Sequence, residues 1–113
     1  MFKPEVGATV WLVLGHTDMR KGIDGLMGLV THYHKLDPWS GHYFVFKGRQ
    51  NNRLKILYYD RTGYCLWMKR LGEGTFCFPR SEAETMAING EQLTWLLSGL
   101  DIGMAHKSVK YYA

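Results

Sequence analysis

Cysteine and proline are scarce in this chain of 113 residues, with two and three copies respectively. The two cysteines, Cys65 and Cys77, are too few for a disulfide scaffold and are typical of a reducing compartment. Apolar runs such as Val10–Leu14 are far shorter than the ~20 residues that span a bilayer. Residues 1–5 lack the apolar core of a secretory signal. We therefore expect a cytoplasmic protein with no membrane partner.

Acidic residues are nearly absent from one stretch of the chain. Residues Pro38–Gly72 hold seven Lys or Arg and a single acid, Asp60, which gives a local charge of +6. The remainder holds seven basic and nine acidic residues, a local charge of −2, and the two parts sum to the net charge of +4. A basic middle of this kind attracts polyanions such as nucleic acid, although strands also carry Lys and Arg on a solvated face.

Aromatic residues, in contrast, are plentiful. Sixteen Phe, Trp and Tyr residues and a charged fraction of 21% argue against disorder. The length fits one domain over residues 1–113, with a weakly patterned tail at residues 103–113.

Apolar patterning predicts five strands and two helices. The strand-like stretches are Val6–Leu14, His42–Lys47, Arg53–Asp60, Gly63–Arg70 and Ala83–Ile88, and Thr75–Phe78 is a further apolar stretch. The first is apolar enough to be buried on both faces. Tight turns are predicted at Gly48–Asn52, Asp60–Gly63 and Gly72–Gly74.

Helical spacing of apolar residues begins at Ile23 and ends before Asp37-Pro38, with Thr17 or Asp18 available as a cap. Its apolar face would comprise Ile23, Leu26, Met27, Val30 and Tyr33. A second helix opens at Asn89 or Gly90, places Leu93, Leu96, Leu97 and Leu100 on one face, and ends near Gly99. This order predicts an α+β fold: a mainly antiparallel, strongly curved sheet of about five to six strands with two packed helices.

Patterns for catalysis and metal binding are missing. His32 and His34 stand two apart on a predicted helix and so point in different directions, and no CxxC, HExxH, GxSxG or phosphate-loop motif occurs. Both cysteines lie within apolar sequence, where a thiol usually behaves as a small hydrophobe. Only Asp18 and Asp24 stand in an unusual local setting for carboxylates. We expect no enzyme activity, no cofactor and no metal.

A polar loop with basic flanks is the most suggestive feature for binding. Arg49 and Arg53 enclose Gln50, Asn51 and Asn52. Arginine binds phosphate bidentately, and Asn or Gln can bind base edges. A solvated hairpin loop above a packed core explains the same residues equally well.

Three sequence blocks carry a family resemblance. They are Thr17–Leu26, which begins TDMRKG; Phe44–Arg49; and Arg53–Asp60, followed by Gly63, Leu66, Lys69-Arg70-Leu71, Glu73, Gly74, Phe76, Phe78-Pro79 and Leu96–Asp101. Together they resemble TnpB, the accessory protein from the second open reading frame of the insertion sequence sixty-six family. Tyr59, where the family often has Trp, and Cys77-Phe78-Pro79, where a Trp-Pro ending is more usual, are apolar departures.

The resemblance implies a non-catalytic role in transposition beside a separate, larger transposase. Our first hypothesis is that the chain binds DNA or the transposase–DNA complex. The nucleic-acid-binding residues expected for this role are Arg20, Lys21, Lys47, Arg49, Arg53, Lys55, Lys69 and Arg70.

Two alternatives stay open at this point. One is a protein-only adaptor or homo-oligomer that contacts the transposase through Trp39, Trp67 or Trp95. The other is a cryptic enzyme that uses Asp18 and Asp24 on a metal. Arg20 and Lys21 also have a structural alternative, pairing with these two acids to fix the loop before the helix.

Overall fold

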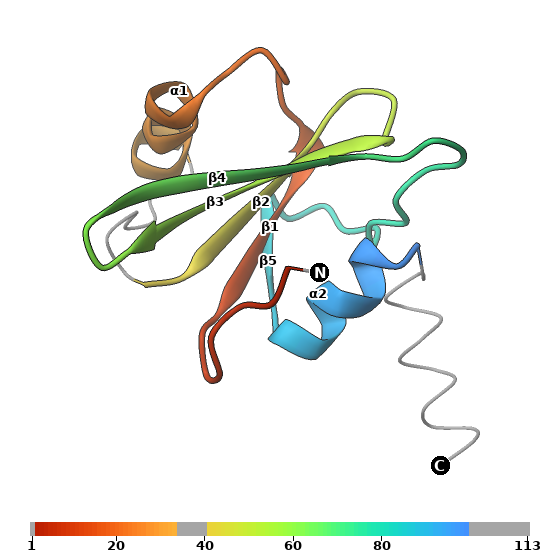
Figure 1. Ribbon diagram of the computed structural model, residues 1–113. Coiled ribbons are helices and arrows are strands. Elements are labelled where there is room, and N and C mark those ends of the chain that lie inside the picture. Colours follow the sequence, from red (N-terminus) through yellow and green to blue (C-terminus); the bar gives the residue numbers. More distant parts are fainter. Residues whose placement is uncertain (1, 34–40, 100–113) are drawn as a thin grey trace.

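The computed structural model describes residues 2–33 and 41–99, and its centre is one five-stranded sheet (Figure 1). In chain order the elements are β1 Val10–His16, α1 Ile23–Gly28, the π-helix η1 Leu29–Tyr33, β2 Tyr43–Lys47, β3 Arg53–Asp60, β4 Gly63–Arg70, β5 Thr85–Ile88 and α2 Gly90–Leu97. The strand order is β4-β3-β2-β1-β5. Figure 1 shows α1 and α2 on opposite faces of the sheet.

The sheet is mixed, which corrects one part of the predicted fold. β1 and β2 run parallel, with Val10 beside Tyr43, while the other three neighbouring pairs are antiparallel. A connection that carries a helix across one face returns the chain parallel to the strand it left. The expected strong curvature is also wrong, because helices cover both faces and the sheet lies between two cores instead of wrapping around one.

Because side chains alternate along the strands, neighbouring residues of one strand pack in different cores. Leu54 and Ile56 of β3 pack on the α2 side, whereas Leu57 packs on the α1 side. β1 supplies both faces, with Leu12 in one core and Val13 in the other, so the predicted burial on both faces is confirmed.

The first helix begins at Ile23 and buries its predicted face, but its predicted cap is wrong. Leu26 and Val30 are fully buried, as the spacing from Ile23 requires. The N-cap is Gly22 and has no side-chain cap, so neither Thr17 nor Asp18 caps the helix. Asp18 instead accepts the Arg20 backbone N–H in a turn before it. The side chain of Tyr33 and the expected stop at Asp37-Pro38 lie outside the described residues.

The predicted strands β3 and β4 are confirmed to the residue, and β2 begins one residue later than expected. The last strand is shorter than Ala83–Ile88, and Thr75–Phe78 is irregular, because it pairs with no strand. Phe76 is nonetheless buried, and its N–H donates to the Asn51 carbonyl at 2.6 Å. This bond holds the segment after β4 against the β2–β3 loop.

The second helix begins as the sequence indicates. The Asn89 side chain accepts from the Gln92 backbone N–H at 2.8 Å, and the Gln92 side chain accepts from the Asn89 N–H at 2.9 Å. Leu93, Leu96 and Leu97 are buried against the sheet, and Gly99 follows with a positive φ of 88°. Leu100 and the tail at residues 103–113 lie outside the described residues. Among the residues described, no helix has the length and apolarity needed to cross a membrane.

Candidate nucleic-acid interface

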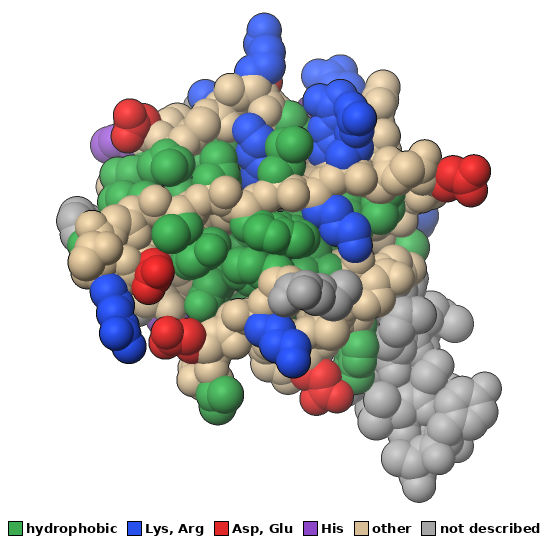
Figure 2. All heavy atoms as spheres, in the orientation of Figure 1, with side chains coloured by type: hydrophobic (Ala, Val, Ile, Leu, Met, Phe, Trp, Pro, Cys, Tyr) green, Lys and Arg blue, Asp and Glu red, His purple; other side chains and the backbone are tan. Residues whose placement is uncertain are grey.

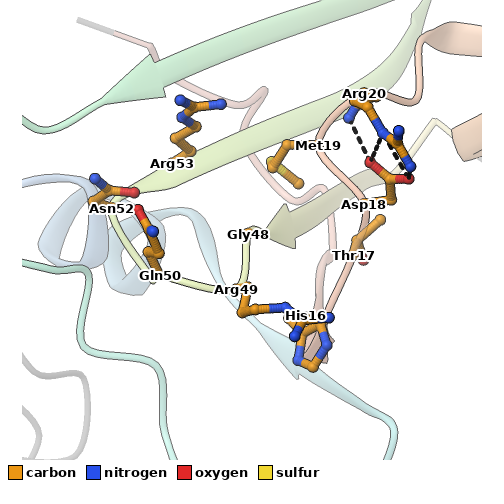
Figure 3. Close-up of a pocket in the computed structure, with 10 residues that line it drawn as sticks. All are labelled: His16, Thr17, Asp18, Met19, Arg20, Gly48, Arg49, Gln50, Asn52 and Arg53. Atoms are coloured by element: carbon orange, nitrogen blue, oxygen red, sulfur yellow. Dashed lines mark hydrogen bonds and ion pairs between the residues drawn. The ribbon is translucent and has the colours of Figure 1, made fainter.

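A polar hollow opens where β1 and β2 end. Because the two strands are parallel, the loops that follow them, residues 17–22 and 48–52, emerge at the same edge of the sheet. The hollow has a volume of about 670 Å3. Its lining comprises His16, Thr17, Asp18, Met19, Arg20, Gly48, Arg49, Gln50, Asn52 and Arg53 (Figure 3). Below we call it the loop pocket.

Backbone and side-chain contacts fix the two loops relative to each other. The Thr17 N–H donates to the Lys47 carbonyl at 2.7 Å, which extends the pairing of β1 and β2 past the strand end. Gly48 is buried beneath Met19, and a Cβ at position 48 would stand 2.8 Å from the Met19 Cγ. Glycine at this position therefore permits the close approach that forms the floor of the loop pocket.

Lys55 anchors the first loop from below. Its ammonium donates to the carbonyls of Met19 and Lys21, each at 2.7 Å. These bonds link β3 to a loop more than thirty residues earlier in the chain. The ammonium is thus engaged inside the protein, and we assign Lys55 to positioning the loop rather than to contacting a ligand.

Arginines surround the loop pocket, and one of them is paired. The Arg20 guanidinium donates to both oxygens of Asp18, the shortest contact being 2.7 Å. These bonds from the guanidinium, with the one from the Arg20 backbone, hold the pKa of the Asp18 carboxyl well below its usual range. The same contact raises the pKa of Arg20. The Arg20 side chain is still 91% exposed, so most of its surface can meet a ligand.

Arg49 and Arg53 carry the remaining positive charge of the lining. Both are exposed, and neither forms an ion pair with any residue of the described ranges 2–33 and 41–99. Figure 3 shows Arg53 at one side of the loop pocket and Arg49 beside His16 at another. Three arginines against one carboxylate give the lining a formal charge of +2. Figure 2 shows Lys and Arg side chains gathered over the loops that follow β1 and β2.

The eight predicted binding residues divide between the two faces of the sheet. Arg20, Arg49 and Arg53 line the loop pocket, and Arg70 stands beside Arg53 in the β3–β4 register. Lys21 lies in the loop itself, where its stem packs near Gly25. These five residues therefore lie in or next to the loop pocket.

Lys47 and Lys69 point toward the α2 side. Lys47 lies 5.1 Å from the centre of the Phe78 ring, and burial lowers the pKa of its ammonium. It lines a second hollow of about 480 Å3 beside the segment 75–81. The Lys69 ammonium donates to the Leu97 carbonyl at 2.9 Å and so holds the last turn of α2. The structure does not bring these two lysines together with the loop pocket.

His16 and Met19 were not predicted as members of the site. Their signal was the parallel pairing of the first two strands, which brings the end of β1 to the loop after β2. Because the sequence led us to expect a mainly antiparallel sheet, it gave no reason to place these two residues near the loop after β2. Of the three amide residues singled out in this loop, Gln50 and Asn52 line the loop pocket, whereas Asn51 lines the second hollow.

The other candidate groups occupy varied settings. Among the described residues, no three His, Cys, Asp or Glu side chains gather as a metal site would need. Both cysteines are half-buried and unbonded to each other. Trp67 and Trp95 are half-buried, and Trp39 lies outside the described residues.

Comparison with known proteins places this chain in a family. A family model described as IS66 Orf2 like protein matches residues 8–107. The chain belongs to this family. It is 46% identical over 92 residues to the uncharacterized protein y4hO of Sinorhizobium fredii, covering 81% of this chain and 80% of that protein. The uncharacterized protein y4jC of the same organism is 33% identical over 101 residues, covering 89% and 86%. No solved structure matches the chain.

Membership in the IS66 Orf2-like family confirms the resemblance drawn from the three sequence blocks. It makes the chain a transposition-associated accessory protein of an insertion sequence. Two of those blocks, Thr17–Leu26 and Phe44–Arg49, contain the loop pocket's arginines Arg20 and Arg49. The third block begins at Arg53. The sequence blocks that carry the resemblance therefore include residues of the loop pocket.

Proposed function

We propose that this IS66 Orf2-like protein is a non-catalytic accessory of transposition that binds DNA through the loop pocket. The observation that carries the proposal is the convergence of Arg20, Arg49 and Arg53 on one hollow. Guanidinium groups match phosphate oxygens bidentately and remain charged at every physiological pH. We place Arg70 and Lys21 at the margin of the same contact.

The amides of the β2–β3 loop support the same proposal. Gln50 and Asn52 line the loop pocket together with the arginines. Hydrogen-bond donors for phosphate oxygens and hydrogen-bonding groups for base edges are therefore available in one place. We further propose that the chain acts in the cytoplasm on DNA held with the transposase of its element, and that the α2 side is turned away from the DNA.

The experiment is a binding titration with purified protein and labelled duplex. The duplex carries a terminal inverted repeat of the element, a scrambled duplex serves as comparison, and salt is varied from ~50 to ~200 mM. We expect tight binding that weakens steeply with salt, because each phosphate contact releases a counterion. A preference for the terminal repeat would indicate that the protein recognises the ends of the element. Equal binding to both duplexes would indicate phosphate contacts that do not depend on sequence.

Matched variants connect the binding to the loop pocket. Arg49→Gln and Arg53→Gln each remove one charge and should each weaken DNA binding and lower the slope of affinity against salt. Arg61→Asn removes the same charge at the far end of β3, where a φ of 42° suits asparagine, and should leave binding unchanged. Absence of binding at ~50 mM salt would contradict the proposal and favour a protein-only adaptor.

A further inference from the structure

The loop pocket is a single hollow between two loops, whereas a continuous duplex contacts a surface along its length. Its arginines surround a hollow between two loops instead of forming a strip along a flat or convex face. Each strand of a duplex presents one phosphate per about 3.4 Å of helix axis, so a surface that follows the duplex needs cations spread in a row. Cations placed around one hollow suit a single phosphate group better than a row of phosphates.

The amount of charge in the hollow suits a phosphate at a strand end. A phosphomonoester carries about −1.5 to −2 at neutral pH, more than the single charge of an internal phosphodiester. The lining of the loop pocket carries a formal +2 from Arg20, Arg49 and Arg53 against Asp18. Charge complementarity is therefore closer for a terminal phosphate than for an internal one.

The rest of the lining suits the nucleotide attached to that phosphate. A volume of about 670 Å3 lies within the ~300–1,000 Å3 range of pockets that bury small ligands. Gln50 and Asn52 supply both donors and acceptors for a base edge, and Met19 supplies an apolar, polarizable surface against which a base can pack. Phosphate, base-edge and apolar partners thus lie within one cavity.

From these observations we infer that the loop pocket binds a phosphomonoester-bearing nucleotide at the end of a DNA strand. This inference rests on the proposed function and makes it specific, because it names the part of the DNA that enters the cavity. It assigns the arginines to the terminal phosphate and the amides of residues 50 and 52 to the base.

The experiment is a competition assay with the full chain and an internally labelled duplex as probe. The unlabelled competitors share one sequence and differ at their ends: 5′-phosphate, 3′-phosphate, hydroxyl at both ends, and a dumbbell whose strands are closed by loops. A nucleoside monophosphate is the fifth competitor and separates a strand end from a free nucleotide. Arg53→Gln and Arg49→Gln are assayed beside Arg61→Asn, which removes an equal charge outside the loop pocket.

We expect at least one phosphorylated duplex to compete at least about tenfold better than the hydroxyl-ended duplex and the dumbbell, because charge-assisted hydrogen bonds to the extra charge are strong. The advantage should disappear in Arg53→Gln and Arg49→Gln and persist in Arg61→Asn. Equal competition by all four duplexes would overturn the strand-end inference while leaving DNA binding intact. Competition by the nucleoside monophosphate as strong as by DNA would assign a free nucleotide instead. Failure of every DNA to bind at ~50 mM salt would overturn the inference and the proposed function together.

Discussion

At the scale of single residues, the loop pocket depends on how Asp18 and Arg20 share their charges. The carboxylate accepts three hydrogen bonds from the Arg20 guanidinium and one from the Arg20 backbone N–H, so it neutralises part of the positive charge at the loop pocket. A carboxylate beside a phosphate site repels the ligand. We therefore expect Asp18 to lower DNA affinity while it shapes the turn before α1.

Asp18→Asn tests this balance with little change of shape. The amide oxygen can still accept the Arg20 backbone N–H, but the formal charge of the lining rises from +2 to +3. We expect DNA affinity at ~50 mM salt to rise about three- to tenfold, measured by fluorescence anisotropy. A fall in affinity would contradict this and would show that the carboxylate holds Arg20 in its binding orientation.

The pH dependence of that difference follows from the Asp18 pKa. The folded protein holds the pKa below the ordinary value of 3.8, so the ion pair is complete above that pH and is lost only as the pH falls through the lowered value. The affinity ratio between Asp18→Asn and the unchanged protein should accordingly stay constant between pH ~5 and ~8. A ratio that changes across this window would mean that another group titrates with binding.

At the scale of elements, two partly buried lysines make similar hydrogen bonds but hold different elements. Lys55 holds the loop after β1, whereas Lys69 holds the end of α2. Each replacement by methionine keeps an apolar stem and leaves carbonyl acceptors without their charged donor. We expect each variant to lose about 1–3 kcal/mol in the free energy of unfolding, measured by urea denaturation.

The two variants should differ in binding. Lys55→Met removes the bonds that hold residues 19–21 and should weaken DNA affinity as well as stability. Faster amide hydrogen exchange in residues 19–21 would show that this loop has become more mobile. Lys69→Met should leave affinity unchanged, because its contact lies on the α2 side. Equal loss of affinity in both would indicate a global effect and would contradict a positioning role for Lys55.

The start of α2 offers a separate test of local structure. Asn89→Ala removes the side chain that accepts the Gln92 N–H, and the helix keeps its buried leucines. We expect a loss of about 0.5–2 kcal/mol in stability, measured by thermal unfolding. Asn89→Ser retains an acceptor for the Gln92 N–H and should recover most of the lost stability. If serine loses as much stability as alanine, the capping box does not stabilise the helix.

Most of the elements could be predicted from the sequence because their signals are local. Alternation in Arg53–Asp60 and Gly63–Arg70, with a turn between them, determined β3 and β4 to the residue. The relation between β1 and β2 is not local, since it depends on a crossover more than twenty residues long. The loop pocket follows from that relation, which is why Arg49 and Arg53 could be named but His16 and Met19 could not.

The lysines illustrate a second limit. Lys47, Lys55 and Lys69 alternate with apolar residues as a solvated face would, yet all three are partly buried and contact a ring or carbonyls. Charge alone does not show whether a long side chain reaches water or folds back on the protein. Only tertiary contacts separate the three arginines of the loop pocket from these lysines.

At the scale of the whole molecule, the mixed sheet separates two tasks. The α2 side packs the larger core, and the carboxyl ends of β1 and β2 carry the exposed arginines. This arrangement agrees with our proposal that the loop pocket binds DNA and that the α2 side is turned away from it.

DNA binding at the loop pocket is tested most directly by chemical-shift mapping of isotope-labelled protein during titration with a terminal-repeat duplex. If DNA binds at the loop pocket, the perturbed backbone amides should cluster at residues 16–20 and 48–53. Residues 75–81 beside the second hollow should change little. Perturbations confined to the α2 side would contradict the loop pocket as the DNA site. A spectrum unchanged by DNA at ~50 mM salt would contradict DNA binding by this protein altogether.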